Sequence, residues 1–593
     1  MQELKQHYAG RQAEFAAALT KVNRVLRSIS LGRVALALLF LFIGYLGLSQ
    51  SPFFYALPFI AAGFLYLVSL YNKTFLKSRL LQNLVTLNEL EHKAQDHDYG
   101  NFKPGEQFVD PHHPYSYDLD LFGKGSLFQY LNRCGTIIGE NKLADLLLTP
   151  RIDKQNIYER QEAVKDVSEH IQFRQNFWAH AILEKDSSFE VNKVLEWSKD
   201  KNFIEGKLSY KIVLIAGPLI PLSLLAVVIV SSTSWMPALM MAMIVQWSIV
   251  AFHSRKITRV HDVLSKQKQA IDRYAVLLNL IAMESFTSHI FQTIKMKAIE
   301  ASAKVREFSN LINALESRNN GIANLIGNSF FLYDLQSIQK LERWRDVNAA
   351  DLPRWLETIA EADMFCAFGT FHFNNPSYAF PAIKEELSIK AEALGHPLIA
   401  AVERINNDLS QGNPETITII TGANMAGKST FLRAVGVNIV LALAGAPVCA
   451  KAFSCPIIGL RSGMRTSDSL QEHQSYFYAE LHRLQSIMED LRSGKPLLIL
   501  LDEILKGTNS TDKQSGSIAI VEQLVKLNAL VLLATHDVIL GGLQDRFPGQ
   551  VNNGCFESQV DGARLTFDFK LKPGVAQKSN ATFLMKQMGI IPS

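Results

Sequence analysis

The 593-residue sequence has few cysteines and no strong excess of charge of either sign. Its five cysteines (Cys134, Cys366, Cys449, Cys455 and Cys555) are scattered, odd in number and without CxxC or Cys/His spacing. This pattern supports neither a disulfide framework nor a structural zinc site, and it favours a reducing compartment. The formal net charge is only +4, which argues against a surface devoted to nucleic acid, so any basic patch must be local.

Charge is missing altogether from two long apolar segments. Residues 34–72 contain no Asp, Glu, Lys or Arg, and this length is about twice the ~20 residues that cross a bilayer. Residues 212–254 repeat the pattern. The first segment is interrupted at Ser49-Gln50-Ser51-Pro52 and the second at 231–235, where polar residues turn the chain. We therefore predict two transmembrane hairpins with four spans, because a hairpin buried in a soluble core rarely has arms apolar on all faces.

Basic residues flank both predicted hairpins, whereas the two connecting turns carry no charge. The flanking residues are Lys21, Arg24, Arg27, Arg33, Lys73, Lys77 and Arg79 for the first hairpin, and Lys207, Lys211, Arg255, Lys256 and Arg259 for the second. Because positive charge marks the cytoplasmic side, we expect a multi-pass protein of the inner or plasma membrane. Its N-terminus, middle segment and C-terminal domain would all be cytoplasmic.

Outside the apolar segments, the character of the chain changes near residue 385. Before it, helical periodicity predominates. After it, short apolar runs (ITIIT at 417–421, LLILL at 497–501, ALVLLAT at 529–535) alternate with helical segments, which is typical of a parallel α/β sheet. We predict a multidomain protein with an N-terminal segment (1–33), a hairpin (34–72), a helical part (73–211), a second hairpin (212–254), a second helical part (255–384) and an α/β domain (385–593).

A phosphate-binding motif follows the first of these β-like runs. The residues Gly422-Ala423-Asn424-Met425-Ala426-Gly427-Lys428-Ser429 satisfy the Walker A pattern GxxxxGK[ST] and lead into a helical segment. In such a loop the glycines let backbone N–H groups face the phosphates. Lys428 would reach the β- and γ-phosphate oxygens, and the Ser429 hydroxyl would bind Mg²⁺. The sequence therefore predicts ATP and Mg²⁺ as ligands of a P-loop ATPase.

Two acidic residues and a histidine follow the next two β-like runs. The run LLILL ends in Asp502-Glu503, and the run ALVLLAT is followed by His536. Asp502 would hold Mg²⁺ through water, and Glu503 would orient and deprotonate the attacking water. Alone, an acidic pair can simply cap a strand, and a histidine there is usually just exposed. The order after a P-loop favours the catalytic interpretation, with His536 sensing the γ-phosphate.

These motifs together resemble one family. TGANMAGKSTFLRAVG, LLDEILKGTNSTD and ATHD, in that order, are similar to the ATPase domain of the MutS family of DNA mismatch repair proteins, which are ABC-type ATPases. GHPLIAAVERINND resembles the family's segment entering the nucleotide site, and LTFDFKLKPGVAQKSNATFLMKQMGI resembles the family's closing β-hairpin and helix. Residues 121–165 resemble the start of its helical core and lever domain, and Leu356–Phe368 resembles its return helix.

The resemblance assigns roles to individual residues. It makes Gly422, Asn424, Gly427, Lys428, Ser429 and Thr430 the phosphate loop, Asp502 and Glu503 the magnesium and water carboxylates, and His536 the switch. It implies a homodimer through the ATPase domains, with Gly507–Asp512 crossing the interface and Ser475 reaching the nucleotide of the partner subunit. The family has a glycine two residues before this serine, whereas His473 stands here.

One part of the family's pattern is missing. The family's mismatch reader precedes the core and carries a Phe-x-Glu wedge, but here the region before residue 115 is short and holds the first hairpin. Phe203-Ile204-Glu205 has the letters of a wedge, yet this pattern is common by chance and lies just before the second hairpin. We expect a membrane-anchored, MutS-like ATPase with mismatched or structured DNA as a candidate ligand. The alternative is an ABC-type mechanochemical membrane protein that acts on a partner or lipid without DNA.

Overall fold

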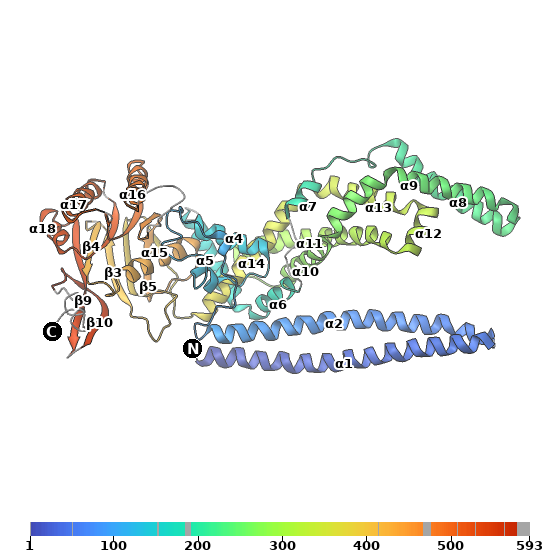
Figure 1. Cartoon of the computed structure of the whole chain (residues 1–593), viewed down its shortest axis with the longest axis horizontal. Helices are drawn as coiled ribbons and strands as arrows, with labels where there is room; N and C mark the ends of the chain where they lie inside the picture. The colour runs from blue at the N-terminus through green and yellow to red at the C-terminus, as the bar shows by residue number, and fades with distance from the viewer. Residues whose placement is uncertain are drawn as a thin grey trace.

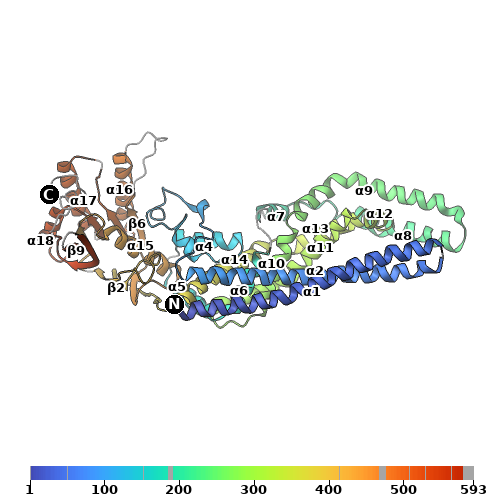
Figure 2. The same ribbon diagram turned by 60° about the horizontal axis from the view of Figure 1, so that its bottom comes forward.

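The computed structural model describes residues 2–49, 51–150, 153–183, 191–412, 414–465, 476–506, 508–527, 529–561 and 564–577. The described chain is mostly helical with two sheets and is strongly elongated (Figure 1). Both sheets lie at one end, helices fill the middle, and two helical hairpins project toward the other end. A second view, turned by 60°, shows the same arrangement (Figure 2).

The first hairpin consists of α1 (Gln2–Ser49) and α2 (Leu57–Ala94), joined by a 3₁₀ turn over Ser51–Ala56. The turn lies where the sequence predicted it, next to Pro52. The predicted boundaries at 33/34 and 72/73 do not separate elements, because each helix continues unbroken from its polar half into its apolar half. At 1.5 Å per residue, α1 is about 72 Å long.

The polar stem of this hairpin is docked, whereas its apolar half stands free. In the stem, Tyr8 Oη donates to Asn374 Oδ1 (2.7 Å), Arg11 Nε donates to Gln175 Oε1 (2.9 Å), and Asn83 Nδ2 donates to the carbonyl of Ala179 (2.9 Å). In the most apolar windows of α1 and α2, only 6% and 0% of residues are buried. By length and composition alone, four of the described helices are suited to cross a membrane.

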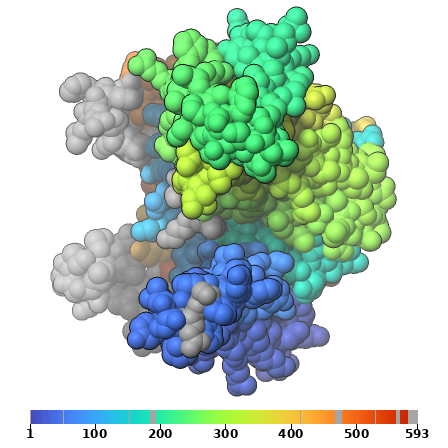
Figure 3. All heavy atoms as spheres, turned by 90° about the vertical axis from the view of Figure 1, so that its right-hand side faces the viewer, coloured from blue at the N-terminus to red at the C-terminus, as the bar shows by residue number. Residues whose placement is uncertain are grey.

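The second hairpin consists of α8 (Leu208–Val230) and α9 (Met236–Ser265), with a 3₁₀ turn over Thr233–Trp235. Pro221 lies inside α8 and has no N–H to donate to the carbonyl of Gly217, four residues earlier. Gln246 Nε2 of α9 donates to that carbonyl instead (2.6 Å). Figure 3 looks onto the end toward which both hairpins point and shows them as separate blue and green masses.

The helices between the hairpins and the sheets form one continuous core. They are α3 (Leu127–Leu131), α4 (Ile137–Leu148), α5 (Lys154–Glu169), α6 (Ile171–Ala181), α7 (Val191–Trp197), α10 (Lys268–Met283), α11 (His289–Glu316), α12 (Gly321–Phe331), α13 (Tyr333–Asn348) and α14 (Leu352–Asn374). Buried Asp363 of α14 accepts hydrogen bonds from the N–H groups of Gly135 (3.1 Å) and Thr136 (2.8 Å). The central helix α14 is thereby fixed to the start of α4.

The wedge-like sequence Phe203-Ile204-Glu205 lies at the foot of α8. The N–H groups of its three residues donate to the carboxylate of Glu342 on α13, at 2.7, 3.0 and 2.7 Å. The Phe203 ring stacks on His253 of α9. These contacts attach the second hairpin to the helical core, and they give this segment a structural role.

The C-terminal part contains two sheets. The larger has the order β10-β9-β4-β8-β7-β6, formed by β10 (Arg564–Pro573), β9 (Val551–Asp561), β4 (Ile417–Gly422), β8 (Leu530–Thr535), β7 (Leu497–Asp502) and β6 (Gly459–Gly463). All its neighbouring strands pair in parallel except β9 and β10, which form the antiparallel hairpin that the resemblance implied. The predicted parallel sheet is therefore present.

A four-stranded sheet was not predicted. It has the order β1-β5-β2-β3, formed by β1 (Ala382–Lys384), β5 (Ala452–Pro456), β2 (Ser388–Leu394) and β3 (Asn407–Gly412). Its first strand begins three residues before the predicted boundary at 385. The helices of this part are α15 (Lys428–Ala444), α16 (Tyr476–Arg492), α17 (Ser510–Lys526) and α18 (Leu543–Arg546).

The carboxylate of Asp118 joins the segment before α3 to the α/β part. Its Oδ2 accepts hydrogen bonds from Ser462 Oγ (2.8 Å), the N–H of Met464 (3.1 Å) and the guanidinium of Arg483 on α16 (2.8 Å). Its Oδ1 accepts from the N–H of Arg465 (3.0 Å). The side chain is fully buried. A buried carboxylate with four donors is a strong joint, because each donor would otherwise lose its partner.

We expect Asp118→Ala to destabilise the protein by about 3–5 kcal/mol, because it leaves the partly buried Arg483 charge and two N–H groups without their acceptor. Thermal unfolding of the detergent-purified chain should show a lower midpoint than the wild type. The matched control is Asp110→Ala, an exposed aspartate of the same segment that caps only a local turn. Equal midpoints for the two variants would contradict the importance of this joint.

Candidate functional site

The Walker A residues form a loop between a buried strand and a helix. All six residues of β4 are buried, and the loop after Gly422 leads directly into α15. Gly422 and Gly427 have φ angles of 154° and 106°, and a Cβ on Gly422 would lie 2.6 Å from the carbonyl oxygen of Phe556. These two positions therefore need glycine. The strand, loop and helix appear in the order that the sequence predicted.

Lys428, the first residue of α15, folds back over this loop. Its Nζ donates to the carbonyl oxygens of Gly422 (2.8 Å) and Ala423 (3.0 Å). Burial lowers the pKa of Lys428, although the carboxylates of Glu503 and Asp502 oppose the shift. The ammonium thus points into the loop at the N-terminus of a 17-residue helix, where backbone N–H groups and the helix dipole favour an anion.

Two carboxylates and a histidine come from the neighbouring strands. Asp502 ends β7 and pairs in register with Ala534 of β8. Glu503 follows with a φ of 56°, and its N–H donates to the carbonyl of Ala534 (2.9 Å). His536 lies just beyond β8, and its Nδ1 is 3.1 Å from Glu503 Oε1. The left-handed backbone at Glu503 directs this carboxylate out of the strand and toward His536.

The surroundings of Glu503 favour its ionised form. Partial burial raises the pKa of Glu503, but the hydrogen bond and charge of His536, together with the nearby charges of Lys506 and Lys428, outweigh burial and lower it overall. Its carboxylate is therefore charged at neutral pH. A charged, oriented carboxylate next to a phosphate-binding loop is able to accept a proton from water.

Glu480 supports this region and was not predicted from the sequence. Its carboxylate accepts hydrogen bonds from the N–H groups of Leu505 (2.6 Å) and Lys506 (3.2 Å), and so fixes the turn after Glu503. Burial raises the pKa of Glu480 despite these two donors. Its position in the first turns of α16 gave no signal, since its partners lie about 25 residues away.

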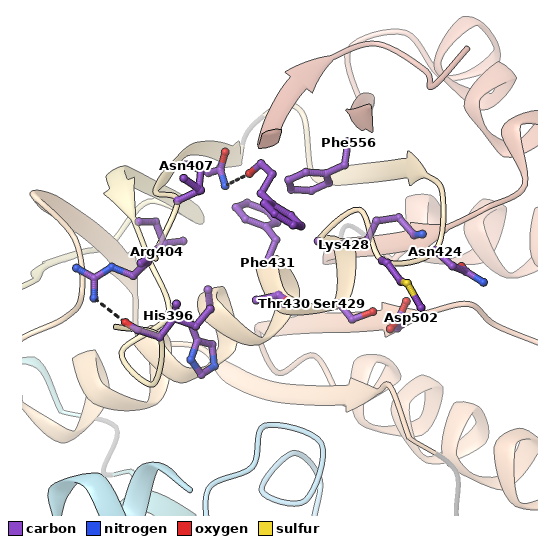
Figure 4. Close-up of a pocket in the computed structure, with 18 of the residues that line it drawn as sticks. His396, Arg404, Asn407, Asn424, Lys428, Ser429, Thr430, Phe431, Asp502 and Phe556 are labelled. Carbon is purple, nitrogen blue, oxygen red and sulfur yellow. Dashed lines mark hydrogen bonds between the residues drawn. The ribbon is translucent and has the colours of Figure 1, made fainter. Parts of the chain in front are cut away.

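A cavity of about 510 Å³ extends from the loop toward the smaller sheet. Figure 4 shows Lys428, Ser429 and Asp502 at one end and His396, Arg404 and Asn407 at the other, with Phe431 and Phe556 between them. Burial, with the charges of Arg433 and Arg404, lowers the pKa of His396 to about 4, so this ring is neutral. Phe569 of β10 also lines this end, and its carbonyl accepts from Asn407 Nδ2 (3.0 Å). The cavity thus has a phosphate-loop end and an opposite end that carries the neutral His396 ring, the Asn407 amide and the Arg404 guanidinium.

The structure brings together most of the predicted site residues. Asn424, Met425, Gly427, Lys428, Ser429, Thr430, Asp502 and Glu503 line the same cavity, Ala426 and Ala423 belong to the loop, and His536 contacts Glu503. Ser475, His473 and Gly507 lie outside the described residues. Of the segment predicted as a loop over Gly507–Asp512, the last three residues form the first turn of α17, which Asn509 caps by accepting a hydrogen bond from the N–H of Asp512 (2.8 Å).

The donor set suits a phosphate chain with a hard cation. The Ser429 hydroxyl and the Asp502 carboxylate line the same cavity as Lys428 (Figure 4), and oxygen ligands of this kind are those that Mg²⁺ prefers. Among the described residues, no group of three or more His, Cys, Asp or Glu side chains forms a separate metal site.

Comparisons with known proteins agree on one family. A family model described as MutS domain III matches residues 117–493, and one described as MutS domain V matches residues 418–592. Residues 2–94, which form the first hairpin, lie outside both matches.

Curated relatives give the same result. The DNA mismatch repair protein MutS of Thermotoga neapolitana is 34% identical over 232 residues, which cover 38% of this chain and 28% of that protein. MutS of Thermotoga petrophila is 36% identical over 220 residues, covering 36% and 27%. MutS of Lachnoclostridium phytofermentans is 24% identical over 533 residues, covering 79% and 54%. The chain therefore spans little more than half, and often under a third, of these relatives.

We expect Glu503→Gln to retain nucleotide affinity but to slow hydrolysis by ~10²- to 10⁴-fold, the usual contribution of a general base. Lys428→Ala should weaken nucleotide binding itself. The control is Glu489→Gln, an exposed carboxylate on α16. Wild-type turnover in Glu503→Gln would show that another group activates the water.

The contact between His536 and Glu503 gives a second prediction. Because His536 helps to lower the pKa of Glu503, His536→Ala should raise that pKa and shift the acid limb of the pH–rate profile to higher pH.

Proposed function

Because the chain belongs to the MutS family, we propose that it is a membrane-anchored ATPase that binds and hydrolyses ATP with Mg²⁺ as a dimer. The observation that carries this proposal is the convergence of Lys428, Ser429, Asp502 and Glu503 on one cavity, with His536 in contact with Glu503. These four residues of the cavity lie within the part matched by MutS domain V. The anchoring is supported by four helices of suitable length and composition.

The proposed mechanism assigns one task to each side chain. Lys428 would exchange its two loop carbonyls for phosphate oxygens, while the N–H groups at the start of α15 bind the rest of the chain of phosphates. Ser429 and Asp502 would hold Mg²⁺, which neutralises charge on the phosphates. Glu503 would take the proton of the attacking water on its carboxylate, and His536 would keep that carboxylate oriented.

The dimer is proposed from the family pattern. Ser475 of one subunit would reach the nucleotide held by Lys428 and Glu503 of the other, and the loop from Gly507 to Asp512 would cross the interface. His473 stands where the family has a glycine, so the Ser475 contact would have to form beside a bulkier side chain.

The output of the ATPase would travel through the helical core to the membrane. Both hairpins project away from the nucleotide cavity, at the opposite end of the molecule (Figure 1). The relatives are DNA mismatch repair proteins, so we propose mismatched or structured DNA as the ligand recognised on the cytoplasmic side. The pair of hairpins is the specific observation that favours the alternative, which is action on a partner or on lipid. No Asp, Glu, Lys or Arg lies in 34–72 or 212–254, which argues against a path for ions.

Membranes washed with carbonate should retain the protein, and release by carbonate would contradict the anchoring.

ATPase stimulation distinguishes the two proposed outputs. After purification and reconstitution into vesicles, hydrolysis should increase on addition of mismatched or branched DNA and less with plain duplex. A rate that responds only to lipid composition, and to none of the three DNAs, would favour the mechanochemical alternative.

A mixing experiment tests the shared active site. Ser475→Arg and Lys428→Ala should each inactivate a homodimer. A heterodimer of the two would carry both lesions in one composite site and none in the other, so part of the activity should return. Heterodimers that form but remain as inactive as either parent would contradict a site shared between subunits.

A further inference from the structure

Helix α12 has an inverted distribution of polarity. Its side chains Ile322, Leu325 and Ile326 are 73%, 56% and 51% exposed, whereas Asn328 and Ser329 are buried. A helix on the surface of a soluble core shows the opposite pattern, with apolar residues inside and polar residues outside. Three neighbouring apolar side chains on one face of a short helix therefore need an apolar partner.

The buried polar groups of α12 are already satisfied by protein. Asn328 Oδ1 accepts from the N–H of Asp334 (3.0 Å), and its amide donates to Asn324 Oδ1. Ser329 Oγ accepts from Trp247 Nε1 of α9 (3.0 Å). Asn320 Oδ1 caps the helix by accepting from two backbone N–H groups. A helix in contact with hydrocarbon requires such hydrogen bonds within the protein, because no water is present to replace a missing one.

The contacts of α12 place it at the depth of the second hairpin's apolar segment. Ser329 bonds to Trp247, and Leu332 packs so closely on α8 that a Cβ on Gly217 would lie 2.6 Å from it. Gly217 is six residues past Lys211, and Trp247 is eight residues before Arg255. At 1.5 Å per residue these positions lie about 9 and 12 Å inside the basic flanks. Half of the hydrocarbon layer is about 15 Å thick.

Helix α12 carries no charged residue, and one charged residue stands on each side of it. Residues 319–333 contain no Asp, Glu, Lys or Arg. The flanking residues Arg318 and Asp334 are paired with each other at 3.2 Å. Arg318 also donates to Thr258 Oγ1 (3.1 Å), in the part of α9 beyond Arg255. The charged flank of α12 therefore coincides with the predicted end of the bilayer, and its uncharged part lies beside the spans.

We propose that α12 is a third membrane element, whose Ile322, Leu325 and Ile326 face lies among lipid acyl chains of the cytoplasmic leaflet beside α8 and α9. This inference depends on the membrane anchoring proposed above. Because α12 connects α11 to α13, it attaches the helical core to the bilayer at a point separate from the two hairpins. Figure 1 shows α12 beside α8 and α9, at the end of the helical core nearest to that hairpin and short of the hairpin's tip.

Depth-dependent quenching tests the proposal on the full chain in phosphatidylcholine–phosphatidylglycerol vesicles. Single cysteines at Leu325 and Ile326 are labelled with an environment-sensitive fluorophore; all five native cysteines are buried. Leu219→Cys on α8 serves as the control within a span, and Val347→Cys, which is 69% exposed at the end of α13, as the aqueous control. The quenchers are iodide in the buffer and lipids that carry a nitroxide on the acyl chain.

The two labels on α12 should be quenched by nitroxide lipid to an extent similar to the label at Leu219. A nitroxide near the headgroup should quench them more strongly than one deeper in the acyl chain, and iodide should quench them little. If they respond to iodide as Val347 does while Leu219 responds to lipid, the inference on α12 is wrong and the anchoring stands. If Leu219 also responds to iodide, the anchoring itself is wrong. Labels on α12 shielded from both quenchers would show that protein, such as a second copy, covers this face, and would also overturn the proposal.

Discussion

The buried carboxylate of Asp118 is the contact on which the coupling between the two ends of the molecule depends. It binds donors from the β6 region and from α16, and its neighbour Asp120 extends the joint. The Asp120 carboxylate forms a bidentate pair with Arg465 and lies 3.1 Å from Arg433 on α15. This short segment of the helical part thus contacts two helices of the α/β part. One is α15, which follows the phosphate loop, and the other is α16, whose Glu480 fixes the turn after Glu503. A shift of α16 has to move this segment, because separating the buried Asp118 carboxylate from Arg483 would leave an uncompensated charge.

Local patterns predicted the elements whose residues are uniform in character. The strands β7 and β8 are apolar runs up to their last residue, β4 combines isoleucine with threonine, and both hairpins turn where polar residues break an apolar run. The strands of the smaller sheet were missed because sequences such as SIKAEAL and NDLSQG mix polar and apolar residues on a half-buried surface. The joint at Asp118 could not be found from the sequence, because its partners lie about 345 to 365 residues further along.

In the candidate site, too, the residues of local motifs were predicted, and the residues that act through contacts distant in sequence were not. The order of Lys428, Asp502, Glu503 and His536 along the chain was sufficient to predict that they meet, because the carboxyl ends of parallel strands share one edge of the sheet. Glu480 and His396 were missed, since the role of each arises only from packing against loops distant in sequence. Helix α12 was missed because its length is too short for a span and its polarity is inverted, a pattern that is informative only once burial is known.

The hydrogen bond between Gln246 and the carbonyl of Gly217 has a consequence for biogenesis. In α8 the proline at 221 leaves that carbonyl without its helical donor, and in α9 the Gln246 amide is a polar group within an apolar arm. Either arm entering hydrocarbon by itself would carry an unsatisfied polar group, at a cost of several kcal/mol by general estimates. Gln246 Nε2 and the Gly217 carbonyl meet only in one register of the two arms. Under the proposed membrane anchoring, the translocation machinery should therefore release the two arms into lipid as a pair.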